Sequence, residues 1–406
     1  MKYLILIGDG MGDYPIAELA GKTPLEAAET PMMDELCRKG ELFLTHTVPE
    51  GYPPGSDVAN MSLLGYDPAA CYTGRAPLEA AAMGIRLAAD EIAFRCNLVT
   101  LGQVAGQGLI MHDFSAGHIS SAEGAELIAA LEASCGGDQF HFHPGVGYRH
   151  LLISRGDHPG FVTVPPHDHI GKEVSAHFQE YLSQTAWRQL LETARQVLAD
   201  HPVNHRRLAD GKSPASLIWP WGEGRMPSLP TLVDRFAISG SMISAVDLLK
   251  GLGVLGGLTI CNVPGATGYL DTNYAGKAEA ALTALKTQDL AFVHVEAPDE
   301  TGHQGLLAEK IRAIEDFDGK IVAPIIAGLR ARDETFRVVT TMDHFTPLSL
   351  RTHVSDPVPT LLYDSRELQP GSGRSFSEKD GREHDAHHGG ALTAGHRLIE
   401  KLLLRL

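Results

Sequence analysis

Carboxylate and imidazole side chains stand together in three short motifs in the C-terminal part of the chain. Asp299 and His303 are four residues apart, a spacing that places both on one side of a helical turn. Asp343 and His344 are adjacent, and His353 follows nine residues later. A lone histidine is more often structural than a ligand, but several such motifs, each soon after an apolar run, favour a metal site. Mixed carboxylate and imidazole ligands suit Mn²⁺ or Zn²⁺, and suit Mg²⁺ less well because of the imidazoles.

A further carboxylate follows the first apolar run of the chain. Asp9 lies in the glycine-rich segment 8–13, GDGMGD. A dinucleotide fingerprint would need a third glycine where Asp13 stands, and acidic groups at this turn would repel a pyrophosphate. Two interpretations are left. Asp9 either is held at a strand end to bind a cation or belongs to a simple Asp-Gly turn.

Ser56 is the candidate nucleophile. It follows the segment PPG at 53–55 and precedes a helix-like stretch at 58–64. A helix N-terminus stabilises an anion through its free backbone N–H groups and its dipole, so this place suits an N-cap serine and equally a serine that becomes phosphorylated. Three aspartates and three histidines are enough ligands for two ions, which can activate a serine and neutralise phosphoryl oxygens. The residues therefore predict metal-dependent phosphoryl or sulfuryl transfer through Ser56.

Short apolar runs precede most of these motifs and predict the strands that position them. The runs lie at 3–7, 290–295, 337–340 and 359–363. Runs that are apolar on both faces are typical of buried strands in a parallel sheet. Stretches with helical spacing lie between them, at 277–285 and 309–329. This alternation predicts an α/β doubly wound fold with a mostly parallel sheet, in which functional groups gather at the carboxyl ends of the strands.

The middle of the chain has fewer buried-strand patterns and is punctuated by proline and glycine. Helices are predicted at 121–134 and at 172–198. We expect an insertion here, in which residues 95–211 form a separate α+β domain. Residues 1–94 and 212–406 would then form one catalytic domain that carries the metal motifs.

The composition excludes several classes of partner. The chain has 406 residues and a formal net charge of −16, which repels a phosphate backbone, so we expect no nucleic-acid binding. It contains no run of about 18 apolar residues, so no membrane-spanning segment is expected. Five scattered cysteines without a Cys-x-x-Cys pair predict reduced thiols and a cytoplasmic location. The oligomeric state stays open.

Longer strings of the sequence resemble one enzyme family. The metal motifs are similar to those of the alkaline phosphatase superfamily. The segments 54–68 (PGSDVANMSLLGYDP), 72–80 (YTGRAPLEA), 93–100 (AFRCNLVT) and 297–305 (APDETGHQG) resemble the archaeal-type, cofactor-independent (2,3-bisphosphoglycerate-independent) phosphoglycerate mutases. The likeness runs from the first predicted strand to the last helix.

The resemblance implies a phosphatase-like α/β domain with an inserted substrate-capping domain and two divalent metal ions, with Mn²⁺ expected before Zn²⁺ or Mg²⁺. It implies one ion held by Asp9, Ser56, Asp343 and His344, and another held by Asp299, His303 and His353. It also implies that Ser56 takes the phosphoryl group from 3-phosphoglycerate and returns it to the 2-hydroxyl of the trapped glycerate. The cap would exclude water during this exchange.

The resemblance and the arginine chemistry together predict three substrate-binding residues. His118, in the segment DFSAGHIS at 113–120, resembles a cap histidine that family members place near the phosphoryl group. Arg149 suits a carboxylate or phosphate clamp because a guanidinium binds such groups through two hydrogen bonds. Arg207, or its neighbour Arg206, is a second candidate clamp. The competing interpretation of each arginine is a solvated surface charge.

Other functions share the metal motifs. A phosphotransferase acting on homoserine would need an ATP site, yet the sequence lacks a Gly-x-x-x-x-Gly-Lys-[Ser/Thr] loop. A phosphomonoesterase would differ only in using water as the acceptor, and a non-enzymatic protein would not need all seven site residues. The histidine-rich segment 383–388 (EHDAHH) is expected to lie in a solvated, flexible loop between Glu378 and Gly390 rather than to form another metal site.

Overall fold

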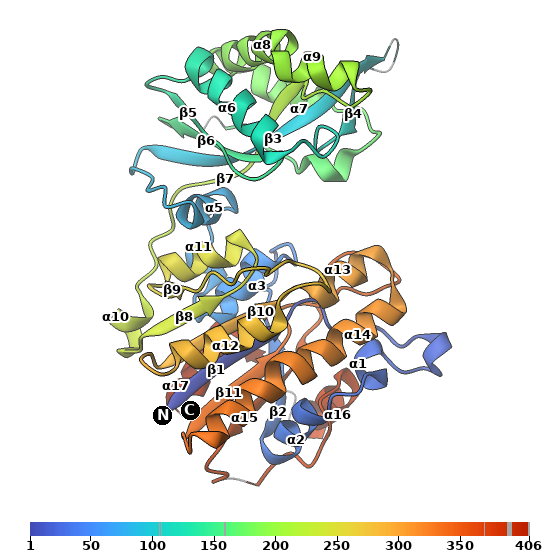
Figure 1. Cartoon of the computed structure of the whole chain (residues 1–406), viewed down its shortest axis with the longest axis vertical. Helices are drawn as coiled ribbons and strands as arrows, with labels where there is room; N and C mark the ends of the chain where they lie inside the picture. The colour runs from blue at the N-terminus through green and yellow to red at the C-terminus, as the bar shows by residue number, and fades with distance from the viewer. Residues whose placement is uncertain (105, 107, 158–159, 369, 388–391, 405–406) are drawn as a thin grey trace. The chain divides into compact units, whose positions relative to one another are not determined.

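A computed structural model of the protein describes residues 1–104, 106, 108–157, 160–368, 370–387 and 392–404. The chain forms two units: Met1–Tyr72 with Ser228–Leu406, and Thr73–Pro227 (Figure 1). The predicted insertion at 95–211 lies inside the second unit, which extends beyond it on both sides. This extension arises because α5 (Ala76–Ala82) and β7 (Leu217–Gly224) pack against β3 (Glu91–Val104).

The first unit is built on a mostly parallel sheet. In the described part of the chain its eight strands run in the order β13-β2-β12-β11-β1-β10-β8-β9. Their bounds are β1 Lys2–Gly8, β2 Glu41–His46, β8 Gly240–Ile243, β9 Thr259–Ile260, β10 Leu290–Val295, β11 Phe336–Thr341, β12 Val358–Asp364 and β13 Thr393–Ala394. Strand β1 lies between β10 and β11 and is parallel to both. Every residue of β10 and β11 is buried, as expected of strands covered on both faces.

The expectation that the run at 359–363 is parallel was wrong. Strand β12 pairs antiparallel with both β11 and β2. The segment between β11 and β12 forms turns rather than a helix, and a parallel pairing normally needs a crossover element. The apolar pattern identified the strand but carried no information on its direction.

Helices cover the sheet of the first unit, and the two predicted ones are confirmed. The run at 277–285 falls in α12 (Tyr274–Ala284), and the run at 309–329 becomes α14 (Leu307–Phe317) and α15 (Ala323–Ala331), joined by a π-helical turn at Asp318–Val322. These helices contribute to the main core, in which Ile314, Phe317 and Ile325 are fully buried. The remaining helices are α1 Pro24–Ala27, α2 Pro31–Lys39, α3 Ser56–Leu63, α4 Pro68–Cys71, α10 Leu232–Phe236, α11 Asp247–Leu255, α13 Ala297–Gln304, α16 Glu378–His387 and α17 Leu398–Leu404.

The second unit has an antiparallel sheet and its own core. Strand β3 pairs with β4 (Gly108–Asp113), β6 (Arg149–Arg155) and β7, and β6 pairs with β5 (Phe140–His143). Its longer helices are α6 Ser121–Cys135, α7 Ser175–Leu182, α8 Thr185–Asp200 and α9 Pro202–Ala209. Phe94 and Trp187 pack edge to face at 4.9 Å between ring centroids in this core.

The sequence predicted one helix of the second unit correctly and a second helix only in part. Helix α6 begins after Ser120, whose hydroxyl accepts from the backbone of Glu123 in a capping box, so this prediction is confirmed. The single helix expected at 172–198 is instead α7 and α8, which are separated at Ser183 and Gln184. The Ser183 hydroxyl donates to the carbonyl of Glu180, which satisfies an end carbonyl of α7.

The histidine-rich tail segment was expected to be a loop, and this expectation was wrong for the residues that are described. Helix α16 continues to His387, while residue 388 lies outside the described residues. Glu378 anchors the helix because its buried carboxyl accepts from Asp13 N at 3.1 Å and from Thr23 Oγ1 at 2.7 Å. All five cysteines are free. Over the described ranges, none of the helices has the length and apolar character needed to cross a membrane.

Candidate metal centre and active site

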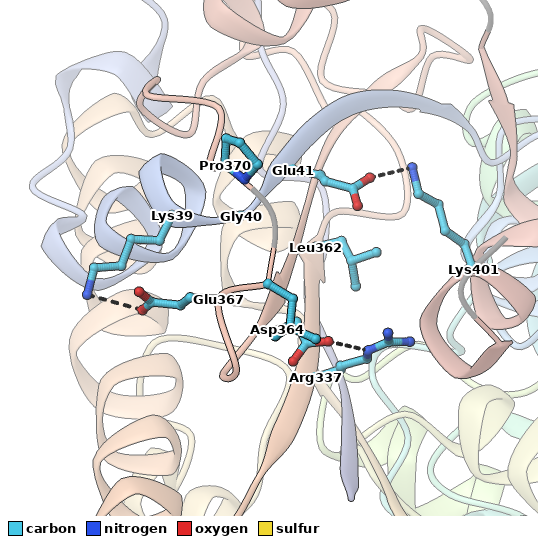
Figure 2. A pocket seen from close by; sticks show the side chains of 10 residues that line it. Lys39, Gly40, Glu41, Arg337, Leu362, Asp364, Glu367, Pro370 and Lys401 are labelled. Carbon is cyan, nitrogen blue, oxygen red and sulfur yellow. Dashed lines mark hydrogen bonds and ion pairs between the residues drawn. The ribbon is translucent and has the colours of Figure 1, made fainter.

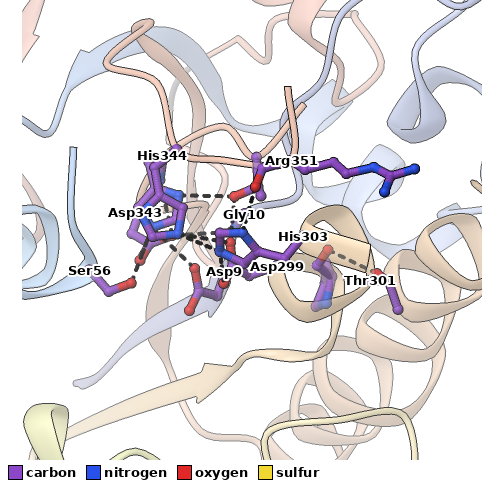
Figure 3. A network of polar contacts seen from close by, with 12 residues as sticks. Asp9, Gly10, Ser56, Asp299, Thr301, His303, Asp343, His344 and Arg351 are labelled. Atoms are coloured by element: carbon purple, nitrogen blue, oxygen red, sulfur yellow. Dashed lines mark hydrogen bonds and ion pairs between the residues drawn. The ribbon is translucent and has the colours of Figure 1, made fainter. Parts of the chain in front are cut away.

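Three adjacent parallel strands carry the acidic and imidazole motifs to one edge of the first unit's sheet. Asp9 follows β1, Asp299 lies on α13 after β10, and Asp343 follows β11. Because these strands are neighbours and parallel, their carboxyl ends lie together and the side chains converge (Figure 3). The three carboxylates are buried, with exposed fractions of 2%, 7% and 0% respectively.

Asp299, His303 and His353 lie on one side of this cluster. Asp299 Oδ2 lies 3.3 Å from His303 Nε2, and its Oδ1 lies 3.3 Å from His353 Nε2. The two imidazole Nε2 atoms are 2.8 Å apart. His303 Nδ1 lies 3.0 Å from the carbonyl of Arg351, which directs Nε2 toward Asp299.

Asp9, Asp343 and His344 form the other side. His344 Nε2 lies 3.5 Å from Asp9 Oδ1 and 3.4 Å from Asp343 Oδ2. The loop that carries Asp9 passes close to Asp299 at Gly10, whose φ is +60°. A Cβ at Gly10 would lie 2.6 Å from Asp299 Oδ1, so only glycine brings the two motifs this close.

Ser56 points into the cluster and does not cap its helix. It is the first residue of α3, Gly55 occupies the N-cap position, and no side chain caps the helix. The Ser56 Oγ lies 3.1 Å from His344 Nε2 (Figure 3). The alternative that Ser56 serves only as a helix cap is therefore excluded by the geometry.

His294 is a member of the cluster that the sequence reasoning missed. It lies on β10, is fully buried, and places Nε2 3.2 Å from Asp9 Oδ2. Its strand, LAFVHV, was read as an apolar run because the other five residues are apolar. One feature of the sequence could have identified it: a single histidine inside an otherwise apolar strand.

The electrostatics of the cluster call for added positive charge. Burial, together with the charges of Asp343 and Asp299, raises the pKa of Asp9 well above its usual value. Burial alone would also raise the pKa of Asp299, but hydrogen bonds from His303 and His353 hold it well below its usual range. Burial lowers the pKa of His294 to about 4, so this imidazole is neutral at neutral pH. A cation in the cluster would oppose the raised pKa of Asp9 and favour its ionised form.

The residues fit divalent metal ions. The separations between ligand atoms run from 2.8 Å between two imidazole nitrogens to 3.5 Å between His344 and Asp9. Two ligands of one ion, each about 2.1 Å from it, lie about 3.0–3.4 Å apart at ordinary bond angles. In the described part of the chain, the buried Asp9 Oδ1 has no hydrogen-bond partner. An ion would satisfy such a buried, unpartnered oxygen.

Among the described residues, two separate groups of possible ligands lie in the cluster. Asp299, His344 and His353 form one, and Asp9, His294 and Asp343 form the other, each with its ligand atoms within 4.8 Å of one another. The predicted assignment paired His344 with Asp9 and Asp343, and His344 Nε2 lies between the groups. All seven predicted metal-site residues are brought together, while their division between two ions stays a prediction.

Comparisons with known proteins identify the family. A family model described as 2,3-bisphosphoglycerate-independent phosphoglycerate mutase matches residues 37–204. A Geobacter sulfurreducens relative is 49% identical over 405 residues, covering 100% of both chains. The 2,3-bisphosphoglycerate-independent phosphoglycerate mutase of Methanosarcina acetivorans is 51% identical over 93% of this chain and 94% of its own. This chain belongs to the 2,3-bisphosphoglycerate-independent phosphoglycerate mutase family.

Solved structures agree with this family and with the α/β fold predicted from the sequence. A Pyrococcus horikoshii protein of 29% identity superposes with a TM-score of 0.81, covering 99% of this chain and 96% of its own. The cofactor-independent phosphoglycerate mutase of Thermoplasma acidophilum, at 26% identity, has a TM-score of 0.64 and covers 99% of both chains. The predicted family and fold class are confirmed.

In this family member, the second unit presents His118 on a tightly held loop after β4. Ala116, Gly117 and His118 have positive φ values of 48°, 65° and 48°. The carboxylate of Asp113 accepts from the backbone N–H groups of Ser115 and Gly117 at 2.7 and 3.0 Å and fixes the turn. The His118 side chain is exposed, so the loop presents it to solvent within this unit.

The arginine candidates of the second unit differ in accessibility. Arg149 is exposed at the start of β6, with its guanidinium 5.8 Å from the ring centre of Tyr148. Arg207 is buried, pairs with Glu123 at 3.0 Å, and donates to the carbonyls of Ala116, Gly117 and Ser213. Its guanidinium thus supports the His118 loop from inside the unit. This arrangement runs against the prediction that Arg207 clamps the substrate directly.

A cavity of the first unit lies at the opposite ends of these parallel strands and offers less chemistry. This cavity of about 430 Å³ is lined by residues from the start of β2 and β11 and the end of β12. Its charged groups form the pairs Lys39–Glu367, Lys401–Glu41 and Arg337–Asp364 at 3.5, 2.9 and 2.8 Å (Figure 2). Paired charges of both signs suit structural support rather than the binding of an anion.

Proposed function

We propose that this chain interconverts 3-phosphoglycerate and 2-phosphoglycerate through a phosphoserine at Ser56 and without 2,3-bisphosphoglycerate. The names of its relatives state this mutase activity for those proteins. The observation that carries the proposal here is the place of Ser56 Oγ, 3.1 Å from His344 Nε2 and beside a buried cluster of carboxylates and imidazoles. A serine so placed is suited to accept a phosphoryl group.

We assign one divalent ion to Asp9, Ser56, Asp343 and His344 and the other to Asp299, His303 and His353, and we propose Mn²⁺ as the native metal. Such ions supply the positive charge that lowers the pKa of the serine hydroxyl and neutralises phosphoryl oxygens. Ser56 at the first position of α3 adds free backbone N–H groups and the helix dipole, which stabilise the transferred group.

The reaction balances as two transfers through one side chain. Ser56 Oγ gives up its proton and forms a bond to phosphorus as the bond between phosphorus and the 3-oxygen breaks; the 3-oxygen takes up a proton, which leaves glycerate and a phosphoserine. The 2-hydroxyl of the reoriented glycerate then gives up its proton and attacks the phosphoserine, and Ser56 Oγ leaves and takes up a proton. Water must stay out between the two steps, since its attack would release inorganic phosphate.

We propose that the second unit caps the substrate and that His118 and Arg149 contact it. Both side chains are exposed, and a guanidinium binds a carboxylate or a phosphate through paired hydrogen bonds. Arg207 acts through the loop that carries His118, because its guanidinium is already engaged by that loop. We also propose a cytoplasmic location, which the five free cysteines support.

The test is a conversion assay on purified chain loaded with Mn²⁺. The protein is incubated with 3-phosphoglycerate in the absence of 2,3-bisphosphoglycerate, and ³¹P NMR follows the products. We expect 2-phosphoglycerate to appear with little inorganic phosphate, and we expect a chelator to stop the reaction. Release of phosphate alone would instead indicate a phosphomonoesterase. Transfer from ATP to homoserine, without mutase turnover, would indicate a phosphotransferase.

A further inference from the structure

Four of the proposed metal ligands are each oriented by a contact from outside the cluster. Asp343 accepts from Asn60 Nδ2 at 2.9 Å and from Gly10 N at 3.2 Å. Thr346 Oγ1 donates to Asp299 and lies 3.3 Å from His344 Nδ1. The Nδ1 of the fourth ligand, His303, lies at hydrogen-bond distance from a backbone carbonyl. Such supporting contacts fix the direction in which a ligand atom points.

Asp9 differs from these ligands in what surrounds its carboxylate. Its two oxygens face different groups: Oδ1 lies 3.5 Å from His344 Nε2, and Oδ2 lies 3.2 Å from His294 Nε2. In the described ranges, Oδ1 has no hydrogen-bond partner. The group placed to support Asp9 is therefore His294.

The backbone holds His294 beside Asp9. Strand β10 pairs with β1 so that His294 is opposite Ile7, and Asp9 N donates to the carbonyl of Val295 at 2.9 Å. The carbonyl of His294 accepts from Lys277 Nζ at 3.1 Å. The imidazole is fully buried, and among the residues described neither ring nitrogen makes a hydrogen bond, although Nε2 lies 3.2 Å from Asp9 Oδ2. Burial of an unpartnered imidazole destabilises a fold, so this position needs another reason.

We propose that His294 is a positioning residue of the metal centre: with the ion bound, its Nε2–H, now 3.2 Å from Asp9 Oδ2, donates to that oxygen and thereby keeps Oδ1 turned toward the ion that Asp9 shares with Ser56, Asp343 and His344. This inference rests on the proposed two-metal function. The separate directions of the two Asp9 oxygens favour a supporting role over direct ligation, because Oδ1 is the oxygen that faces the other ligands of that ion.

The experiment measures Mn²⁺ binding rather than turnover. Free Mn²⁺ is titrated by its EPR signal against the wild-type protein, His294→Leu and His294→Gln. We expect the leucine variant to weaken one of two sites by about 10- to 100-fold, as loss of a supporting contact does elsewhere. Glutamine keeps an N–H donor at nearly the reach of Nε2, so we expect its affinity to stay within about threefold of wild type. The matched control is His150→Leu, which removes a buried imidazole with an unpartnered Nε2 from the second unit and should leave both sites unchanged.

The outcomes separate this inference from the function on which it rests. If the wild-type protein binds no Mn²⁺, the proposed function fails. If wild type binds two ions and both His294 variants bind them equally well, or both lose affinity equally, the positioning role is overturned. Should His294→Leu not fold, anomalous diffraction from Mn²⁺-loaded wild-type crystals decides. We expect Nε2 within about 3.0 Å of Asp9 Oδ2 and the ion on Oδ1. An ion within about 2.3 Å of Nε2 would make His294 a ligand and overturn the proposal.

Discussion

The two units hold their proposed functional residues in opposite ways. In the first unit, Asp9, Asp299 and Asp343 are buried and are fixed by contacts between loops that lie far apart in the sequence. In the second unit, His118 and Arg149 are exposed. Fixed geometry suits ion binding and phosphoryl transfer, whereas exposed side chains on loops and strand ends suit contact with a substrate. We therefore expect substitutions in the first unit to affect chemistry and those in the second to affect binding.

Each unit nevertheless uses one buried cation to hold a functional loop. In the first unit, Lys310 Nζ donates to Asp13 Oδ2 at 2.9 Å and to the carbonyls of Gly12 and Thr346 at 3.1 and 2.8 Å. It thereby joins the loop after β1 to the loop after β11. Arg207 does the same for the His118 loop in the second unit, where its partner Glu123 is 28% exposed. The units thus differ less in how a loop is held than in whether its functional side chain is buried.

The largest effect is expected from Ser56→Ala. Without the Oγ no phosphoserine can form, so we expect kcat of the mutase reaction to fall by at least about 10⁴-fold, as removal of a nucleophile does in other enzymes. Thermal unfolding should change little, because Ser56 is only half-buried and does not cap α3. The matched control is Ser62→Ala on the same helix, whose buried hydroxyl has no partner in the described residues and which should keep its activity. Retained activity in Ser56→Ala would remove Ser56 from its role.

The next largest effect is expected on stability, from Lys310→Met. This change leaves the buried carboxylate of Asp13 without its ion-pair partner, and we expect the free energy of unfolding to fall by about 3–5 kcal/mol. Lys39→Met removes a half-exposed lysine that pairs with the partly exposed Glu35 at 3.2 Å, and we expect it to cost less than about 1 kcal/mol. Urea unfolding of both variants measures the difference. Equal losses would show that the buried pair does not hold the metal loops more firmly than a surface pair.

The sequence predicted the site of the first unit because one rule of topology governs it. Parallel strands bring their carboxyl ends to one edge, so an aspartate after each of β1, β10 and β11 could be placed in a single cluster without knowledge of the packing. The sequence left two roles open for Ser56, a helix cap and a nucleophile, and the direction of its Oγ decided between them. His294 was missed because it lies inside a strand rather than after one.

Features that depend on packing between distant segments were predicted less well. The pattern of β12 shows a buried strand, but its direction is set by the turn that follows β11. Helix α16 lacks an apolar face, so the sequence suggested a loop, and its first turn is instead held by the buried Glu378. The burial of Arg207 depends on carbonyl groups of residues 116 and 117, which are far away in the sequence.

Glu378 allows a pH-dependent test of the stability of the first unit. Burial raises the pKa of this carboxyl from 4.5 to about 7. The folded state thus binds the proton of Glu378 more tightly than the unfolded state does. The stabilisation that this proton gives to the fold is complete below pH 4.5 and is lost as pH rises through 7. At pH 8 we expect Glu378→Gln to exceed wild type in free energy of unfolding by up to about 3 kcal/mol, and at pH 4.5 to match it. Urea unfolding between these values measures the change, with Glu383→Gln, at an exposed position of the same helix, as the matched control. A constant difference across the range would contradict the raised pKa.

The smallest effect is expected from Arg149→Met in the second unit. If Arg149 only binds the substrate, its loss weakens the ground state and the transition state alike. We therefore expect KM for 3-phosphoglycerate to rise about tenfold with kcat nearly unchanged. Arg155→Met, which removes another exposed arginine at the other end of β6 that pairs with Glu91 at 3.0 Å, should leave both constants unchanged. Steady-state kinetics on the Mn²⁺-loaded protein distinguish the cases. A fall in kcat at constant KM would instead show that Arg149 stabilises the transition state. An exposed side chain of the second unit would then take part in the chemistry, which the comparison of the units assigns to the buried cluster of the first unit.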